Sequence, residues 1–306
     1  MFEKTGKYHR VPVGFGPAPS PRQDPKGERF DWSQAKTTTV GVVVEASVAS
    51  IQALLPEGYE ATASSNGKGT VLFEVMELRN LPWLAGRGYN TWGIYLNDVV
   101  CHRVSPPVKA SYMSVLFESF TDPITTGREE LGFCKLWAEL PDGEVREKGR
   151  THTASWLGFE FLRLELDGLK EHDPATAPGR KPESRIFTHP TKDGILHHRY
   201  VPSVGEPGKH DASYATFCPP PPGEAPVSYY AAPYASPDPC KPKEPTTFAD
   251  GKGAKLEIKK GTFEQLPTLH NVVDGLAALQ LGNVLEVAVQ KFNGASDLKS
   301  NHRIEK

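Results

Sequence analysis

The sequence predicts an α+β fold that is mainly β, with an antiparallel sheet that curls or closes into a barrel or cone and a few flanking helices. Strand-like segments with alternating or β-branched side chains recur along the chain, and only two stretches show convincing helical spacing. Strands and helices also do not follow the regular alternation of a doubly wound parallel sheet. The 28 prolines and 28 glycines among 306 residues fit a chain with many turns.

The chain begins with a polar arm, rich in proline and glycine, over residues 1–36, which we expect to be poorly ordered or draped over the domain. Residues 39–45 are rich in β-branched side chains and predict the first strand. Residues 47–55 place apolar side chains at helical spacing, with Ser47 available as the cap. The Pro-Glu-Gly sequence that follows ends this helix.

Further strands are predicted along the rest of the chain from alternation or β-branched content. They are expected at 70–77, 91–97, 110–120, 133–140, twice within 151–166, and at 196–201, 254–263 and 284–292. A short turn-like helix is expected at 127–131, and the second convincing helix spans 266–279.

These elements predict a single domain over residues 37–293. Its long interruption is the segment 219–245, where ten prolines in 27 positions predict a loop, because proline cannot donate to a sheet ladder. Residues 294–306 are expected to form a polar tail.

Charge and cysteine usage exclude several classes of protein. The 35 Lys and Arg residues nearly balance 37 Asp and Glu residues, so no basic block is available to neutralise the phosphates of a nucleic acid. No apolar run is long enough to span a membrane. The cysteines are scattered without a CxxC pair and no secretory signal is visible, so we expect a reduced, cytoplasmic protein. They are Cys101, Cys134, Cys218 and Cys240.

Generic motifs give little indication of chemistry. His197 and His198 are adjacent, and adjacent strand residues point to opposite faces, so no shared metal is expected. A GxSxG elbow, an HExxH helix and a Walker-type loop are all absent from the sequence. The unusual residue is Lys135, which has apolar neighbours on both sides in Phe-Cys-Lys-Leu-Trp-Ala. A lysine in such a run either extends its ammonium to solvent or is placed there to lose its proton.

The segment around this lysine resembles a known family. Gly127-Arg-Glu followed by Gly-Phe-x-Lys at 132–135 is similar to the active-site segment of the acetoacetate decarboxylases, whose lysine forms a Schiff base with the substrate ketone. The resemblance extends to Leu-Pro-Glu-Gly at 55–58, to the strand at 71–76 with its glutamate, and to 112–123.

The resemblance implies specific roles. It implies that Lys135 is the imine-forming residue and that Glu74 is a catalytic glutamate on an inward face. Leu136 stands where the decarboxylases have a second lysine, and Thr91 stands in place of a second acidic residue. Substrate contacts are expected from Phe73, Thr91, Leu116, Arg128 and Phe133.

The arginine that the family places on its first strand has no clear equivalent, and Thr37 is the nearest residue. A small keto acid needs such a carboxylate-binding arginine, so its absence favours a larger or less charged carbonyl substrate.

The resemblance implies a lyase that forms an imine through Lys135 and needs no cofactor. The expected substrate is a β-keto acid or polyketide-like carbonyl compound, and the expected reaction is decarboxylation. Two alternatives remain open: an aldolase, dehydratase or condensing enzyme of secondary metabolism on the same scaffold, and a small-molecule-binding barrel without turnover. The family also implies a homo-oligomer, and no nucleic-acid or membrane partner is expected.

Overall fold

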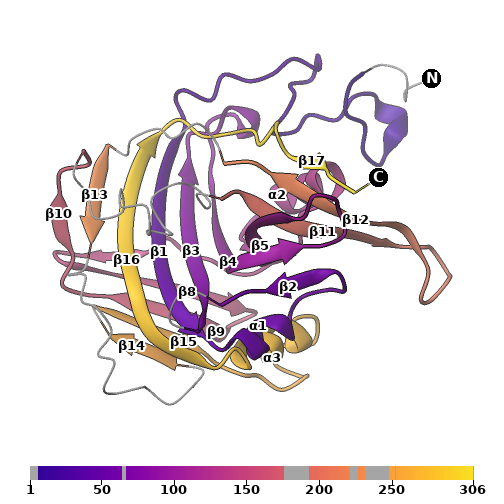
Figure 1. Ribbon diagram of the computed structural model, residues 1–306. Coiled ribbons are helices and arrows are strands. Elements are labelled where there is room, and N and C mark those ends of the chain that lie inside the picture. The colour runs from indigo at the N-terminus through magenta and orange to yellow at the C-terminus, as the bar shows by residue number, and fades with distance from the viewer. Residues whose placement is uncertain are drawn as a thin grey trace.

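The computed structural model describes residues 6–63, 67–175, 193–220, 227–231, 248–251 and 253–305 (Figure 1). The helices are α1 (Val48–Gln52), α2 (Thr121–Thr126) and α3 (His270–Ala277), with short 3-10 helices η2 (Val13–Phe15) and η3 (Pro82–Leu84) and a π-helix η4 (Gly127–Leu131).

The strands fall into two sheets. The large sheet contains β1 (Lys36–Ala46), β2 (Tyr59–Ala61), β3 (Gly69–Arg79), β4 (Tyr89–Cys101), β5 (Val108–Glu118), β6 (Lys135–Trp137), β10 (Lys170–His172), β11 (Ile195–Pro202), β12 (His210–Cys218), β13 (Ser228–Ala231), β16 (Leu281–Asn293) and β17 (His302–Arg303). The small sheet contains β7 (Glu144–Arg146), β8 (Gly149–Trp156), β9 (Phe159–Leu166), β14 (Phe248–Gly251) and β15 (Ala254–Ile258).

The prediction of a mainly β fold with few helices is confirmed, but that of a curled or closed antiparallel sheet is not. The main path of the large sheet runs β10-β13-β16-β1-β3-β4-β5-β11-β12-β17 and has two separate ends among the described residues. Most pairs are antiparallel, yet β5 pairs with both β6 and β11 in parallel. The connection through α2 and η4 carries the chain from the end of β5 back to the start of β6, so β6 pairs with β5 in parallel, whereas β11 reaches β5 only after β7 to β10.

The strand β13 contradicts the prediction of a loop throughout 219–245. It pairs with β16 on one side and β10 on the other. The four-residue strand lies in a proline-free stretch that contains Tyr229 and Tyr230, and aromatic side chains favour strands. Residues 221–226 and 232–245 of the predicted loop lie outside the described residues.

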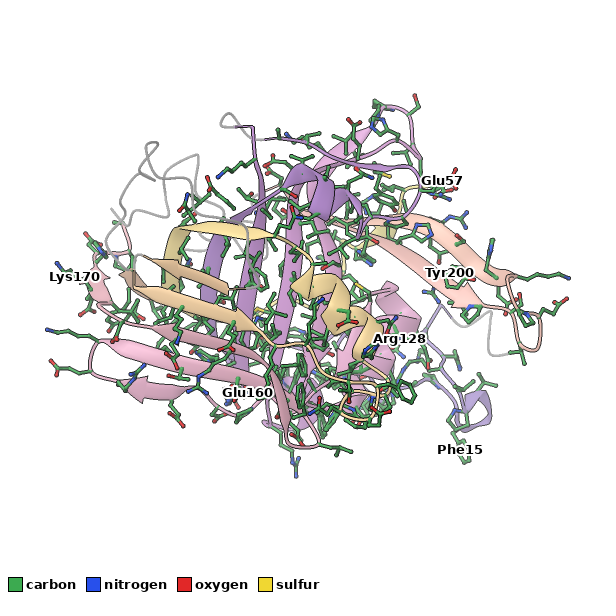
Figure 2. The ribbon with its side chains drawn as sticks, turned by 90° about the horizontal axis from the view of Figure 1, so that it is seen from below. Phe15, Glu57, Arg128, Glu160, Lys170 and Tyr200 are labelled. Carbon is green, nitrogen blue, oxygen red and sulfur yellow. The ribbon has the colours of Figure 1, made fainter. Side chains whose placement is uncertain are left out.

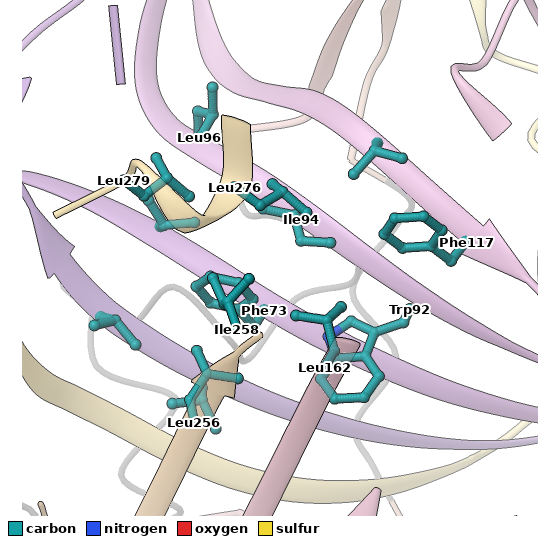
Figure 3. Packing of buried hydrophobic residues seen from close by; sticks show 14 of the residues in the cluster. Phe73, Trp92, Ile94, Leu96, Phe117, Leu162, Leu256, Ile258, Leu276 and Leu279 are labelled. Carbon is teal, nitrogen blue, oxygen red and sulfur yellow. The ribbon is translucent and has the colours of Figure 1, made fainter. Parts of the chain in front are cut away.

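The main hydrophobic core lies between the two sheets. Phe73, Trp92 and Phe117 of the large sheet face Leu162 and Leu256 of the small sheet, as Figure 3 shows. Helix α3 adds Leu276 to the same cluster, and Leu279 follows it. The small sheet and α3 therefore cover one face of the large sheet.

The opposite face of the large sheet carries a second, smaller cluster that includes Leu72, Tyr95 and Leu116. Because side chains alternate along a strand, Leu72 and Glu74 lie on this face while Phe73 lies in the main core. The arm before β1, the α2–η4 segment and the residues after β16 gather on the same side of the molecule (Figure 1). Ion pairs and hydrogen bonds join them, as described below, so this second face is enclosed by segments from three parts of the chain.

The position of Phe73 gives a prediction about stability. Replacing Phe73 with alanine empties a fully buried position in the main core and should lower the free energy of unfolding by about 3–5 kcal/mol. Urea unfolding followed by circular dichroism measures this change. Phe263→Ala is the matched control, since its side chain is 63% exposed, and it should change the free energy by less than about 0.5 kcal/mol. Equal effects of the two substitutions would contradict this packing.

Candidate active site

A cavity of about 530 Å³ lies on the second face of the large sheet. Side chains from β3, β4, β5 and β6 form its floor, and residues of the arm and of the segment 293–298 form its walls. Apolar side chains such as Met113, Leu116 and Phe133 make up much of the lining. A mostly apolar cavity of this size with a few converging polar groups is typical of a small-molecule site.

The polar centre of the cavity is an ion pair between Lys135 and Glu118. The Nζ atom of Lys135 donates to Oε1 of Glu118 at 2.8 Å and to the carbonyl oxygen of Pro123 at 3.0 Å. Lys135 is 6% exposed and Glu118 is 1% exposed. The amine of Lys135 is therefore held away from bulk solvent and faces a chamber that also contains a carboxylate.

Local backbone structure places the lysine. Gly132 adopts a positive φ of 75° at the end of η4, and the chain then enters β6, where Lys135 pairs with Leu116 of β5. A β-carbon on Gly127 would lie 2.3 Å from Cε of Lys135 and 2.6 Å from its Nζ. Glycine at 127 thus leaves the space that the lysine side chain occupies.

Burial dominates the electrostatics of Glu118. Removal from water raises the pKa of its carboxyl above the usual value, although the Lys135 ammonium opposes this change. Among the described residues, its Oε2 atom has no hydrogen-bond partner. A carboxylate with a raised pKa is a better proton acceptor, so Glu118 is suited to exchange a proton with the neighbouring amine.

Glu74 lies on the same face as the cavity, but its side chain does not line it. Burial raises the pKa of Glu74 to about 8, and a hydrogen bond with Tyr95 acts in the opposite direction. Glu74 pairs with Gly41 on one side and Gly93 on the other, and the Tyr95 side chain lies against Gly93. Tyr95 does line the cavity, so its hydroxyl group links the Glu74 carboxyl to the cavity through their hydrogen bond.

The structure places the other residues expected from the sequence in two groups. Thr91, Leu116 and Phe133 line the cavity together with Lys135. Phe73 and Arg128 do not. Phe73 is buried in the main core because strand alternation points it to the opposite face. Arg128, labelled in Figure 2, is exposed on η4, and its Nη1 donates to the backbone oxygen of Lys135 at 3.0 Å.

Leu136 and Thr37 are the positions at which the sequence differs from the charged residues that the resemblance implies. Leu136 packs against the main core, because it follows Lys135 on a strand and points to the other face. Thr37, at the place nearest the family's arginine, lines the cavity at the start of β1. Both residues, Leu136 where the resemblance implies a second lysine and Thr37 nearest the position of the family's arginine, have uncharged side chains.

Three residues of the site were missed in the sequence: Glu118, Tyr95 and Arg22. Glu118 follows Leu116 by two positions on a predicted strand, so alternation already placed both on one face. Tyr95 follows Thr91 by four positions on another predicted strand, so these two side chains also share a face. Arg22 lies in the arm and had no periodic signal, yet it is 6% exposed and lines the cavity.

The described part of the chain contains no group of three or more His, Cys, Asp or Glu side chains that could hold a metal ion. Within the same residues, no helix is both long enough and apolar enough to cross a membrane.

Comparison with solved structures shows the fold. The structure is similar to acetoacetate decarboxylase from Legionella pneumophila subsp. pneumophila str. Philadelphia 1, with a TM-score of 0.53 and 15% identity over 88% of each chain. It is also similar to the enduracididine biosynthesis enzyme MppR, in a complex with the condensation product of pyruvate and imidazole 4-carboxaldehyde. There the TM-score is 0.52 and the identity 12%, over 99% of this chain and 98% of the other.

The sequence gives the family directly. No curated protein matches the chain. The family model of acetoacetate decarboxylase matches residues 10–218, which include Lys135, Glu118 and Arg22. This match confirms the resemblance seen around Lys135, and the chain belongs to the acetoacetate decarboxylase family.

Proposed function

We propose that this protein is a cofactor-independent carbon–carbon lyase that forms an imine through Lys135 and decarboxylates a β-keto acid or a polyketide-like carbonyl compound. The observation that carries the proposal is the buried pair of Lys135 and Glu118, which are joined at 2.8 Å and both line the cavity. Burial of an ion pair carries a desolvation cost and contributes little to stability, so a functional role accounts better for this pair. An amine beside a proton acceptor can become a nucleophile.

In the first step, Glu118 takes a proton from the Lys135 ammonium and leaves a free amine. The Nζ lone pair attacks the carbonyl carbon of the substrate, one proton moves from Nζ to the former carbonyl oxygen, and Glu118 returns its proton to the resulting hydroxyl. Water leaves as the carbon–nitrogen double bond forms. The raised pKa of Glu118 supports both transfers, since the group can hold a proton and release it again.

The protonated imine then accepts electrons from the bond that breaks. Loss of CO₂ moves the electron pair of the carbon–carbon bond into an enamine, and the iminium nitrogen becomes neutral. A proton is next added to the enamine carbon, and water hydrolyses the imine to release the ketone and regenerate Lys135. Tyr95 lines the cavity and is hydrogen-bonded to Glu74, so these two residues are suited to supply that proton.

The cavity favours a substrate with an apolar body. Its volume of about 530 Å³ lies within the range of about 300–1,000 Å³ for drug-sized ligands, and the lining near Lys135 includes Leu116 and Phe133. We therefore propose a carbonyl compound bulkier than the smallest keto acids.

Borohydride trapping tests the proposal. Incubation with a panel of β-keto acids of increasing chain length, followed by reduction and mass spectrometry, should give a covalent adduct at Lys135 and release CO₂ from at least one compound. Lys135→Met should abolish the adduct and CO₂ release. An adduct with β-hydroxy ketones and no CO₂ from any keto acid would instead support the aldolase or dehydratase alternative. Binding of carbonyl compounds without an adduct would support a non-catalytic protein.

Glu118→Gln should slow formation of the trapped adduct by about 100-fold or more, because the amide cannot take the proton from Lys135. Stopped-time borohydride quenching measures this rate. Glu77→Gln is the matched control: Glu77 is partly buried and pairs with the buried Arg150 at 2.9 Å, but it does not line the cavity. A similar loss of rate in both variants would contradict a role of Glu118 in proton transfer.

The Glu74–Tyr95 pair predicts a pH dependence. Glu74, with its pKa raised to about 8, is protonated below that pH and ionised above it. Proton delivery to the enamine carbon should therefore decline as the pH rises through about 8, which deuterium incorporation into the product measures. Glu74→Gln should remove this decline and lower the rate by about 100-fold.

Tyr95→Phe should lower the rate to a similar extent, and the double variant should be no slower than either single variant. Additive losses in the double variant would show that the two residues act separately.

A further inference from the structure

We propose that Arg22, carried by the N-terminal arm, binds a carboxylate group of the substrate inside the cavity. The inference deepens the proposed function, on which it rests, by naming the substrate class: a carbonyl compound that presents a carboxylate toward the arm. It reverses the expectation from the sequence, where the missing arginine on the first strand favoured a less charged substrate.

The arm has a defined structure around Arg22. Ser20 and Gln23 form an isolated β-bridge, and Ser20 Oγ accepts a hydrogen bond from the backbone N–H of Arg22 at 3.1 Å. The Gln23 side chain donates to the backbone oxygens of Tyr8 and Ala18 at 2.7 and 2.8 Å. Ser20, Arg22 and Gln23 are all buried, so this turn fixes the position of the guanidinium against the domain.

Two of the three guanidinium nitrogens of Arg22 are occupied. Nε donates to Oε2 of Glu130 at 2.6 Å, and Nη1 donates to the backbone oxygen of Asp297 at 3.2 Å. Nη2 is buried and has no hydrogen-bond partner among the described residues. Buried N–H groups are nearly always bonded, and a charged one is especially costly to leave unbonded.

The described ion pairs around Arg22 contain more arginines than carboxylates. Glu130 is shared between Arg22 and Arg10, whose Nε lies 3.1 Å from Oε1 of Glu130. The carboxylate of Asp297 pairs with Arg29 instead. Among the described residues of this cluster, three arginines thus face two carboxylates, and Arg22 is the one of the three that lines the cavity, where an anionic group of a ligand would balance its charge.

A second donor lies in the same arm, and a cavity residue connects Arg22 to the catalytic pair. Trp32 lines the cavity, and its buried Nε1–H has no hydrogen-bond partner in the described part of the chain. Tyr89 also lines the cavity, and both the Glu118 carboxylate and the Arg22 guanidinium influence the pKa of its phenol. Arg22 and Glu118 therefore line the same cavity, with Tyr89 near both. A carboxylate has acceptor oxygens that match the N–H donors of Arg22 and Trp32.

The test compares two ligands that differ in the carboxylate alone. Levulinate is a keto acid that keeps its carboxylate after imine formation, and methyl propyl ketone has a methyl group in its place. Borohydride trapping over a range of concentrations gives the half-saturating concentration of each. Arg22→Gln should raise the value for levulinate about 10- to 100-fold, the usual effect of losing a hydrogen bond to a charged group, and leave the value for the ketone unchanged.

Arg103→Gln is the matched control, because Arg103 pairs with a carboxylate, Glu305, at 2.7 Å but neither lines the cavity nor belongs to the Arg22 cluster. It should change both half-saturating concentrations by less than about threefold, and Arg22→Lys should recover part of the loss. An equal rise for levulinate and the ketone in Arg22→Gln, or no rise for levulinate, would overturn the proposal. Thermal unfolding of each variant confirms that the arm change leaves the domain folded.

Failure of the proposed function is distinguishable from failure of this inference. If the wild-type protein forms no adduct with any carbonyl compound, imine chemistry is excluded. Calorimetric titration of Lys135→Met with levulinate then decides the inference alone, since it needs no covalent step. Binding that is lost on adding Arg22→Gln supports the carboxylate site, and binding that is insensitive to this substitution, or absent, overturns it.

Discussion

The architecture of the site depends on one buried ion pair, between the Lys135 ammonium and the Glu118 carboxylate. Moving two charges out of water carries a desolvation cost of several kcal/mol for each ion, and a well-packed apolar pair of similar volume is often no less stable. The ion pair therefore contributes little to the stability of the fold. The same burial that makes the pair costly also lowers the local dielectric constant, which strengthens the electrostatic interaction between the ammonium and the carboxylate.

Several elements cooperate to keep the pair enclosed. The parallel pairing of β6 with β5 places Lys135 beside the end of β5, where Glu118 lies. The turn of α2 supplies the Pro123 carbonyl as a second acceptor, and Gly127 at the start of η4 leaves room for the lysine side chain. Arg128 acts from outside by donating to the lysine's own backbone oxygen. The enclosure is therefore built from backbone geometry as much as from side chains.

Much of this arrangement follows from the sequence, in physical terms. The β-branched and alternating segments predicted most of the long strands, and Lys135 was identified because a charge in an apolar run is costly. Strand alternation also carries information that single residues do not: it places Glu118 with Leu116, and Phe73 on the face opposite Glu74. The expectation for Phe73 failed because proximity in sequence to Glu74 does not mean a shared face.

Other features had no local signal. The strand β13 depends on pairing with β16, to which it has no sequence proximity, and the parallel position of β11 beside β5 is likewise set by distant segments. Arg22 belongs to the arm, whose composition predicts only a poorly ordered or draped segment. Its burial arises from Glu130 and the backbone of Asp297, which lie 108 and 275 positions away in the chain. Long-range contacts of this kind are invisible to periodicity.

The arm also bears on how such a protein can diversify. Lys135 and Glu118 are held by two paired strands, whereas part of the cavity lining comes from the arm, which lies before β1 and outside both sheets. Sequence changes in that segment disturb no strand ladder, so new selectivity can be acquired there at little cost to folding. Substitutions in the arm could therefore alter which ligands bind while the positions of Lys135 and Glu118 stay the same.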